Sequence, residues 1–163
     1  MPVVVYPGSF NPFTHGHANL VERALNLFDK VIVGIGTSVD KDPDVYLSER
    51  IALCRTALED FGDRVVVKGF NGLLVEFVRA NNTRFILRGL RTLTDYDYEF
   101  QMLEMNRHLD PEIEYVLLPT ASQWSFLSAT RVREIASLGG DVSAFVHPAV
   151  AAHLAINNQP KSE

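Results

Sequence analysis

The sequence predicts an α/β fold, with a doubly wound parallel sheet of five strands. Two observations predict it. Short apolar runs rich in β-branched residues alternate along the chain with longer segments whose apolar residues recur at helical spacing. The runs are apolar throughout, as in strands that helices cover on both faces, so the sheet should be mostly parallel.

A single domain is expected because nothing in the 163 residues divides the chain. The sequence contains no internal repeat, no low-complexity segment and no linker. Residues 1–157 should therefore form the domain, and residues 158–163 should form a polar tail that is frayed.

The expected strands are short and apolar. They cover residues 2–6, 31–36, 64–70, 84–90 and 114–119. The first contains the run VVVY, and Pro7-Gly8 should end it.

A helix is expected after each strand. The ranges are 16–28, 48–60, 72–80, 94–108 and 128–138, with a last helix that starts near Pro148. Ser48 and Ser128 are the expected N-caps of their helices, and Gly139-Gly140 should stop the fifth helix. The apolar positions that share one face are Leu20, Val21, Ala24, Leu25 and Phe28 in the first helix, and Leu93, Tyr96, Phe100 and Leu103 in the fourth.

Composition narrows the class of protein. Hydrophobic residues make up 47% and charged residues 21%, as in a soluble globular protein. No run approaches the roughly 20 apolar residues of a membrane helix, and Met1-Pro2 leads directly into a strand without a signal-peptide pattern. A net charge of −5 argues against a general nucleic-acid binder. Cys54 is the single cysteine, so no internal disulfide can form, and a reducing cytoplasm is expected. Cys54 should lie in the core, on a helical face with Ile51 and Leu58.

Polar clusters follow four of the expected strands. They lie at Ser9 to His17, Ser38 to Lys41, Arg88 to Arg91 and Thr120 to Ser128. Ligands of doubly wound sheets bind outside the carboxyl ends of the strands, where the strand order reverses. The pattern therefore predicts one site built from four loops.

The most informative segment is VVVYPGSFNPFTHGH, which spans Val3 to His17. Gly16-His17 opens a helix, whose N-terminus attracts phosphate through unpaired N–H groups and a partial positive charge. Gly16 would let the backbone approach a ligand, and His17 would add an imidazole donor. The alternative is a simple turn in which His17 only packs or caps.

The second informative segment is FILRGLR, from Phe85 to Arg91, which forms a buried strand and the residues at its tip. Arg88 and Arg91 suit phosphate, since a guanidinium can donate two parallel hydrogen bonds. The alternative is that these arginines pair on the surface with Asp95 or Asp97.

Lys41 lies in the acidic loop VDKDPD. It either is solvated or swings over an anionic ligand.

A third segment, WSFLSATR, leads into another helix N-terminus. Two positive helix ends with hydroxyl groups and arginines suit a polyphosphate such as a nucleoside triphosphate. The alternative is simple capping by Ser128. Trp124 and Phe126 would either line a ligand pocket or pack against other apolar side chains. Glu99, one helical turn after Asp95, would hold a ribose or a base or be solvated.

Other nucleotide and catalytic motifs are absent from the sequence. There is no P-loop, and Val39 stands where a dinucleotide fingerprint needs its third glycine. Esterase and zinc-protease motifs are also missing. The other histidines, His15, His108, His147 and His153, have no metal-ligand spacing, so no structural metal is expected.

These residues resemble the nucleotidyltransferase superfamily. Thr14-His15-Gly16-His17 matches its first signature, (His or Thr)-x-Gly-His, and LSATRVRE is similar to the second, usually Ile-Ser-Ser-(Ser or Thr)-x-x-(Lys or Arg). The run RGLRTLTDYDYEFQMLEMNRHL closely resembles the corresponding segment of the bacterial phosphopantetheine adenylyltransferases. The likeness covers about residues 3 to 155 and implies the Rossmann-like nucleotidyltransferase fold.

The resemblance implies an activity and a set of site residues. That family transfers an adenylyl group from ATP to 4′-phosphopantetheine, which gives dephospho-coenzyme A and pyrophosphate in coenzyme A synthesis. His17 would stabilise the transition state, and Lys41, Leu74, Arg88 and Ser9 would bind the pantetheine substrate. ATP would be held by Ser9, Phe10, His17, Gly89, Leu90, Arg91, Glu99, Trp124, Ser125, Phe126, Leu127, Ser128, Ala129 and Thr130.

The family also implies Mg²⁺ with ATP, a homohexamer, and inhibition by coenzyme A. Three residues depart from its usual pattern. His15 stands where Asn or Leu is usual, Ala129 replaces a serine, and Asn11 stands where Asp is common.

Two alternatives stay open. One is a sister nucleotidyltransferase whose acceptor is nicotinamide mononucleotide or glycerol phosphate. The other is a non-catalytic nucleotide-binding or flavodoxin-like module, which would form no pyrophosphate.

Overall fold

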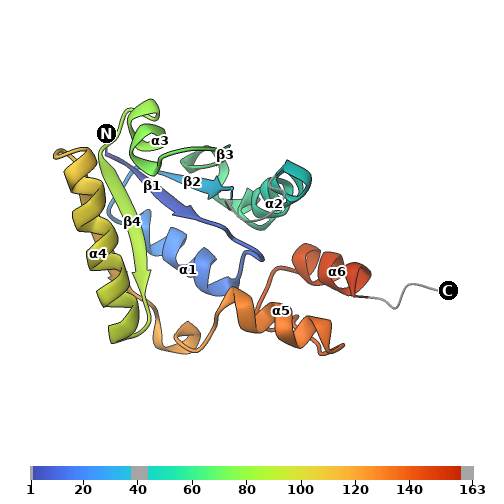
Figure 1. Ribbon diagram of the computed structural model, residues 1–163. Helices are drawn as coiled ribbons and strands as arrows, with labels where there is room; N and C mark the ends of the chain where they lie inside the picture. Colours follow the sequence, from blue (N-terminus) through green and yellow to red (C-terminus); the bar gives the residue numbers. More distant parts are fainter. Residues whose placement is uncertain (1, 38–43, 159–163) are drawn as a thin grey trace.

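The computed structural model describes residues 2–37 and 44–158 and contains a five-stranded parallel sheet (Figure 1). The strand order is β3-β2-β1-β4-β5. The strands are β1 Val3–Gly8, β2 Lys30–Gly36, β3 Val65–Phe70, β4 Phe85–Leu90 and β5 Glu114–Pro119. The predicted α/β class, the parallel sheet and the number of strands are thereby confirmed.

Helices cover both faces of the sheet. They are α1 His15–Ala24, α2 Asp44–Ala57, α3 Leu74–Ala80, α4 Leu93–Leu109, α5 Ala129–Ser137 and α6 Pro148–Asn157, with short 3₁₀ turns η1 Glu59–Arg64 and η2 Ser122–Trp124. One buried cluster joins α1 and α2 to one face of the sheet, and it includes Cys54, as predicted. A second cluster lies on the opposite face and includes Val75 and Val78 of α3.

The strand order reverses at β1, and the sheet opens there. The β1–β2, β2–β3 and β4–β5 ladders each pair six positions, whereas β1 and β4 pair only at Val4↔Phe85 and Val5↔Ile86. The carboxyl ends of β1 and β4 therefore separate. This is the crevice in which a doubly wound sheet binds its ligands.

β1 continues through Pro7-Gly8, so the predicted strand end is wrong. Pro7 pairs with Gly34 of β2, and its carbonyl faces β4, where it accepts a hydrogen bond from Arg88. The backbone nitrogen of a strand residue faces the same side as its carbonyl. Because the ladder to β4 has already ended, the missing N–H of proline interrupts no bond.

The two helix boundaries that differ most from the prediction are the start of α2 and the end of α1. α2 begins at Asp44, so Ser48 lies inside the helix and is not its N-cap. The upstream sequence also contains proline and aspartate, which favour a helix start. α1 ends at Ala24 because the next N–H groups, those of Asn26 and Leu27, donate three residues back instead of four. The guanidinium of Arg64 then binds the carbonyls of Leu25 and Phe28, at 2.7 and 3.2 Å.

The long helix α4 turns polar side chains toward the sheet. Its buried residues are Glu99, Leu103 and Asn106. The apolar residues Leu93, Tyr96 and Phe100, which share a predicted face with Leu103, are 86%, 45% and 47% exposed. Glu99 and Asn106 are drawn inward because Arg88 and the hydroxyl of Tyr115 bind them there.

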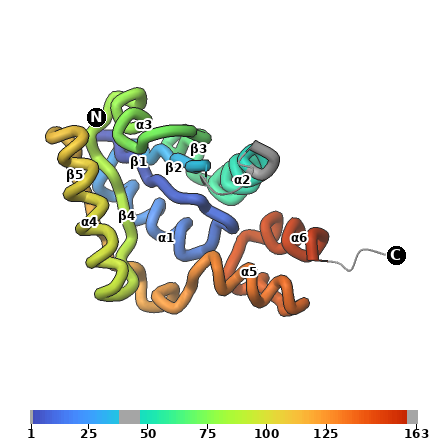
Figure 2. Tube along the Cα trace, in the orientation of Figure 1, coloured from blue at the N-terminus to red at the C-terminus, as the bar shows by residue number. Residues whose placement is uncertain are grey.

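Helices α5 and α6 form a third cluster beside the crevice, built around Val132, Val146 and Val150. Figure 2 shows that the start of α1 lies next to the chain that leads into α5, although these segments are far apart in the sequence. A backbone hydrogen bond of 2.8 Å from His15 N to Phe145 O joins the start of α1 to the segment between α5 and α6. Within the described ranges, no helix is both long enough and apolar enough to cross a membrane.

Candidate functional site

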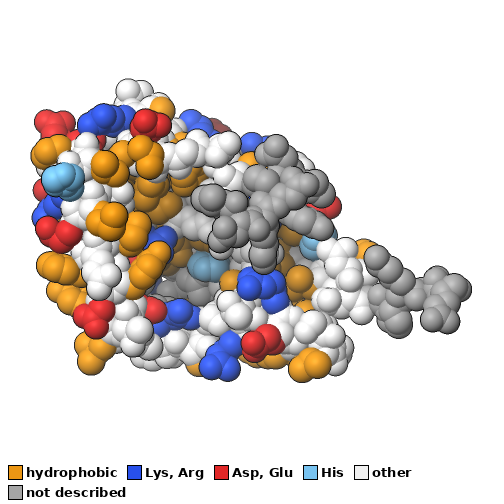
Figure 3. Space-filling view, viewed as in Figure 1, with side chains coloured by type: hydrophobic (Ala, Val, Ile, Leu, Met, Phe, Trp, Pro, Cys, Tyr) orange, Lys and Arg blue, Asp and Glu red, His pale blue; other side chains and the backbone are white. Residues whose placement is uncertain are grey.

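A cavity of about 390 Å³ lies at the carboxyl edge of the sheet. In Figure 3 the molecule is hollowed, and histidine and basic side chains lie in and beside the hollow. The cavity is lined by the turn after β1, the first turn of α1, the end of β4, one face of α4 and the segment from η2 into α5. Three of the four predicted loops thus converge on one site. The fourth, Ser38 to Lys41, lies outside the described residues.

Most of the predicted site residues line this cavity. They are Ser9, Phe10, His17, Arg88, Gly89, Arg91, Glu99, Trp124, Leu127, Ser128, Ala129 and Thr130. Leu74, Leu90, Ser125 and Phe126 are not part of the lining. Leu74 packs against the core cluster on the α3 face of the sheet, and Phe126 is 60% exposed.

The turn before α1 fixes the orientation of His17. Thr14 is the N-cap, and its Oγ1 accepts from the His17 backbone N–H at 3.4 Å. In return, the Thr14 backbone N–H donates to Nδ1 of His17 at 3.0 Å, which completes a capping box. Because Nδ1 accepts this bond, the neutral ring carries its hydrogen on Nε2. His17 therefore caps the helix and still offers a donor to the cavity.

The surroundings of His17 keep its ring neutral. Burial, together with the positive charges of Arg88 and Arg91, lowers the pKa of His17 to about 3. Aromatic rings hold the imidazole, with centroid distances of 5.0 Å to Phe10 and 5.4 Å to Phe13. At neutral pH the lowered pKa makes this side chain an uncharged hydrogen-bond donor.

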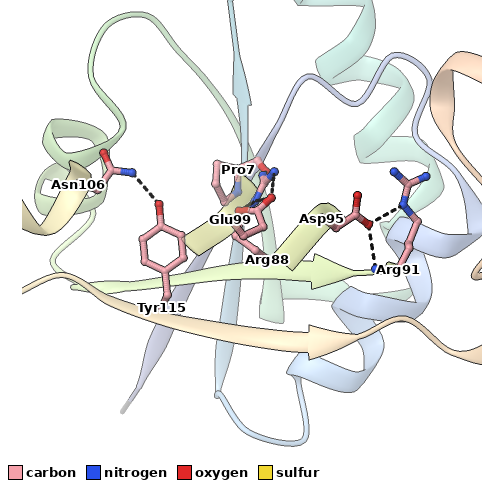
Figure 4. Close-up of polar contacts among 7 residues, drawn as sticks. All are labelled: Pro7, Arg88, Arg91, Asp95, Glu99, Asn106 and Tyr115. Carbon is pink, nitrogen blue, oxygen red and sulfur yellow. Dashed lines mark hydrogen bonds and ion pairs between the residues drawn. The ribbon is translucent and has the colours of Figure 1, made fainter. Parts of the chain in front are cut away.

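Arg88 is held by two partners (Figure 4). Its Nε and Nη2 donate to the Glu99 carboxylate at distances from 2.8 to 3.0 Å, and its Nη1 donates to Pro7 O at 2.6 Å. Burial alone would lower the pKa of Arg88, but the hydrogen bonds and charge of Glu99 outweigh it and raise the pKa. Both oxygens of Glu99 are bound to Arg88, so the carboxylate anchors the guanidinium at the point where β1 and β4 separate.

Arg91 connects two parts of the lining. Its backbone N–H and its Nε donate to Asp95 at 2.9 and 3.2 Å (Figure 4). Its Nη1 donates to Leu127 O at 3.1 Å. The pairing with Asp95 is the alternative that the sequence left open. Arg91 also lines the cavity, so the ion pair and a place in the site coexist.

The second helix N-terminus is capped as predicted. Ser128 Oγ accepts from the Arg131 backbone N–H at 3.2 Å, and α5 starts at Ala129. Ser128, Ala129 and Thr130 all line the cavity. The N-termini of α1 and α5 therefore border the same space, where both dipoles favour an anion.

The lining also includes residues that the sequence analysis did not assign to the site, among them Asn19 and Tyr98. The spacing of these residues along their helices could have identified both. Tyr98 and Glu99 follow Asp95 by three and four residues, and Asn19 follows Gly16 by three, which places each on the same helix face as a cavity residue.

His15, which had no predicted role, connects α1 to the C-terminal helices. Its backbone binds Phe145 O, and its ring lies 5.4 Å from the ring of Trp124. Burial and the nearby His147 lower its pKa.

Comparisons with known proteins agree with this geometry. The sequence model of the cytidylyltransferase-like family matches residues 5–135. The phosphopantetheine adenylyltransferase of Ralstonia nicotianae is 53% identical over 150 residues, covering 92% of this chain and 89% of the relative. That of Azoarcus sp. is 53% identical over 152 residues, covering 93% of each. That of Coxiella burnetii is 50% identical and covers 94% of this chain and 95% of the relative.

Solved structures share the fold. A nicotinic acid mononucleotide adenylyltransferase from Plasmodium falciparum superposes with a TM-score of 0.67 at 15% identity, covering 97% of this chain and 96% of that one. A bifunctional NMN adenylyltransferase/ADP ribose pyrophosphatase from Francisella tularensis gives 0.71 at 18% identity, covering 98% of this chain and 50% of that one. The solved structures support the fold, whereas the assignment to a family depends on the relatives that are 50% identical or more and on the match to the family model. This chain belongs to the cytidylyltransferase-like nucleotidyltransferases and, within them, to the phosphopantetheine adenylyltransferase family.

Proposed function

We propose that this chain transfers the adenylyl group of ATP reversibly to 4′-phosphopantetheine, giving dephospho-coenzyme A and pyrophosphate in coenzyme A biosynthesis. The observation that carries the proposal is the convergence of His17, Arg88 and Arg91 with two helix N-termini on one cavity. Such a site suits two anionic reactants. The names of the relatives that are 50% identical or more supply the acceptor.

The proposed reaction is a direct in-line displacement. A phosphate oxygen of phosphopantetheine attacks the α-phosphorus of ATP, the new P–O bond forms, and the bond to pyrophosphate breaks with its electron pair on the leaving oxygen. The attacking oxygen is already an anion, so no general base is needed, and no covalent intermediate with the protein forms. The protein aligns the two anions and stabilises the charge that shifts between them.

His17 would act as a neutral donor to an oxygen of the phosphate being transferred. Its Nδ1 is bound to Thr14, which leaves Nε2–H for this role. A donor that is preorganised for the transition state accelerates the transfer without any change of protonation.

The remaining site residues divide into those that would bind the acceptor and those that would bind ATP. Arg88, Ser9, Leu74 and Lys41 would bind phosphopantetheine. Arg88 supports this assignment best, because its anchored guanidinium borders the cavity. The nucleotide would contact Phe10, Gly89, Leu90, Arg91, Glu99 and the run from Trp124 to Thr130.

We propose that Mg²⁺ enters as part of the ATP substrate. The carboxylates of Asp95 and Glu99 are bound to Arg91 and Arg88. Among the described residues, no group of three or more His, Cys, Asp or Glu side chains is arranged to hold a metal ion. This supports an ion carried mainly by the triphosphate oxygens, where it neutralises phosphate charge.

We further propose a cytoplasmic homohexamer that coenzyme A inhibits. The resemblance to the family suggests the hexamer and the inhibition, and the single cysteine of the sequence suggests the reducing cytoplasm. The exposed apolar side chains of α4 support assembly, because a face of this kind normally marks an interface. Coenzyme A would compete for the pantetheine side of the cavity.

The decisive assay supplies ATP, Mg²⁺ and 4′-phosphopantetheine and detects dephospho-coenzyme A by mass, together with pyrophosphate. A panel of other acceptors, including nicotinamide mononucleotide and glycerol phosphate, runs in parallel. Pyrophosphate formed only with one of those acceptors would assign the chain to a sister activity. Nucleotide binding with no pyrophosphate from any acceptor would favour a non-catalytic module.

A further inference from the structure

Arg50 contacts the candidate site from outside its lining. It lies in α2, and its Nη1 donates to the carbonyl of Ser9 at 2.7 Å and to that of Gly36 at 3.2 Å. Ser9 follows β1, and Gly36 ends the neighbouring β2. One guanidinium group therefore joins two adjacent strand ends at the edge of the sheet where the cavity opens.

The residue after Ser9 is strained. Phe10 has a φ of +46°, in the left-handed region that bulky side chains rarely adopt. Its ring is nevertheless buried and meets the imidazole of His17 edge to face, with 5.0 Å between centroids. On the other side of Phe10, the carbonyl of Asn11 accepts a hydrogen bond from Arg133 of α5. Guanidinium groups from two helices thus bind the carbonyls of the two residues that flank the strained Phe10.

This arrangement links Arg50 to His17. A strained backbone conformation persists only where its surroundings over-determine it, and charge-assisted hydrogen bonds are stronger than neutral ones. Without its bond to Arg50, the Ser9 carbonyl would be free to turn, and Phe10 could relax to a negative φ. The ring of Phe10 would then leave its contact with the imidazole.

We propose that Arg50 is a positioning residue for adenylyl transfer: it holds the Ser9–Phe10 turn in its strained conformation and thereby keeps His17 aligned with the phosphate that is transferred. The catalytic part of this proposal rests on the proposed function. The positioning part can be measured on the protein without substrate.

Arg55 provides a matched control for Arg50. It lies further along α2, and its Nη2 also donates to a strand carbonyl, that of Val67 in β3, at 3.2 Å. Val67 is not part of the cavity lining. Arg50→Gln should lower kcat about 10- to 100-fold, with a smaller change in KM for ATP, whereas Arg55→Gln should keep wild-type kinetics.

The substrate-free measurement is the NMR signal of the His17 imidazole, which the Phe10 ring shifts by its ring current. This signal should move in Arg50→Gln and stay in place in Arg55→Gln. If Arg50→Gln does not fold, Arg50→Lys serves in its place, because lysine keeps a charge and a donor. Its kcat and its His17 signal should change in the same direction, by less.

Two results would overturn the proposal. One is an Arg50 variant with an unchanged His17 signal and unchanged kcat. The other is a fall in kcat with an unmoved His17 signal, which would mean that Arg50 acts on substrate directly. A wild-type protein that forms no dephospho-coenzyme A would defeat the proposed function instead, and the NMR comparison would still decide whether Arg50 positions His17.

Discussion

At the scale of single residues, His17 shows how one side chain serves both the fold and the site. Its Nδ1 accepts from the Thr14 backbone and completes the capping box, which leaves Nε2 for the cavity. The sequence left capping and phosphate binding as alternatives. The two ring nitrogens allow both at once, because they have different partners.

The first prediction concerns the proposed donor. His17→Ala should lower kcat by roughly 10²- to 10³-fold, because a preorganised transition-state donor is lost, while KM for ATP changes little. Steady-state kinetics of adenylyl transfer measure both constants. Turnover at the wild-type level in this variant would remove His17 from the mechanism.

The second prediction concerns pH. The pKa of His17 is lowered from 6.5 to about 3 in the folded chain, so between these values the unfolded chain binds one more proton. The stability associated with the neutral ring is therefore lost as the pH falls from 6.5 toward 3. Chemical denaturation at a series of pH values should show a slope up to about 1.4 kcal/mol per pH unit steeper in the wild type than in His17→Asn. Equal slopes would contradict a neutral, buried imidazole.

The third prediction concerns the anchor of Arg88. Glu99→Gln removes the carboxylate beside a half-buried guanidinium and should destabilise the chain by about 3 kcal/mol. KM for phosphopantetheine should rise more than KM for ATP. The matched control is Glu114→Gln, which breaks the exposed pair with Arg107 and should cost less than about 1 kcal/mol. A larger rise in KM for ATP would mean that the proposed contact of Glu99 with the nucleotide outweighs its anchoring of Arg88.

At the scale of elements, α4 departs furthest from simple amphipathic patterning. Its buried face carries Glu99 and Asn106, which bind Arg88 and Tyr115, while Tyr96 and Phe100 face outward. Apolar spacing located this helix correctly but did not identify which side faces the sheet. Specific polar partners on β4 and β5 decide that.

The fourth prediction tests the start of α5. Ser128→Ala removes the cap on the Arg131 N–H and should lower the free energy of unfolding by about 1 kcal/mol. Ser137→Ala is the control, since that hydroxyl binds only the carbonyl of Glu134 within the same helix and lies exposed. Urea denaturation compares the two variants, and equal stabilities would show that the cap contributes nothing.

At the scale of the whole molecule, the sheet opens on one side of β1 and remains closed on the other. The two-position ladder between β1 and β4 leaves room for Arg88 to reach Pro7, and the C-terminal helices complete the cavity from beyond the sheet. The exposed apolar side chains of α4 lie on the surface of the molecule.

The fifth prediction concerns the proposed assembly. The wild type should have a mass near six times 18.2 kDa in light scattering. Phe100→Asp places a charge on the exposed face of α4 and should reduce the mass without unfolding the chain. Leu138→Asp, at an 88% exposed position after α5, is the control and should leave the mass unchanged. A monomeric wild type would refute the proposed hexamer.

The sequence alone determined the alternation of strands and helices, the parallel sheet and the loops that carry the site. These depend on local periodicity, on caps such as Ser128 and on turn residues, all of which are visible along the chain. Only the tertiary structure decided the separation of β1 from β4, the anchoring of Arg88 by Glu99 and the hydrogen bond from Arg50 to the carbonyl of Ser9. Each of these depends on residues that are distant in the sequence. Three-dimensional packing decides which of them meet, and so which side chain becomes the partner of a buried charge.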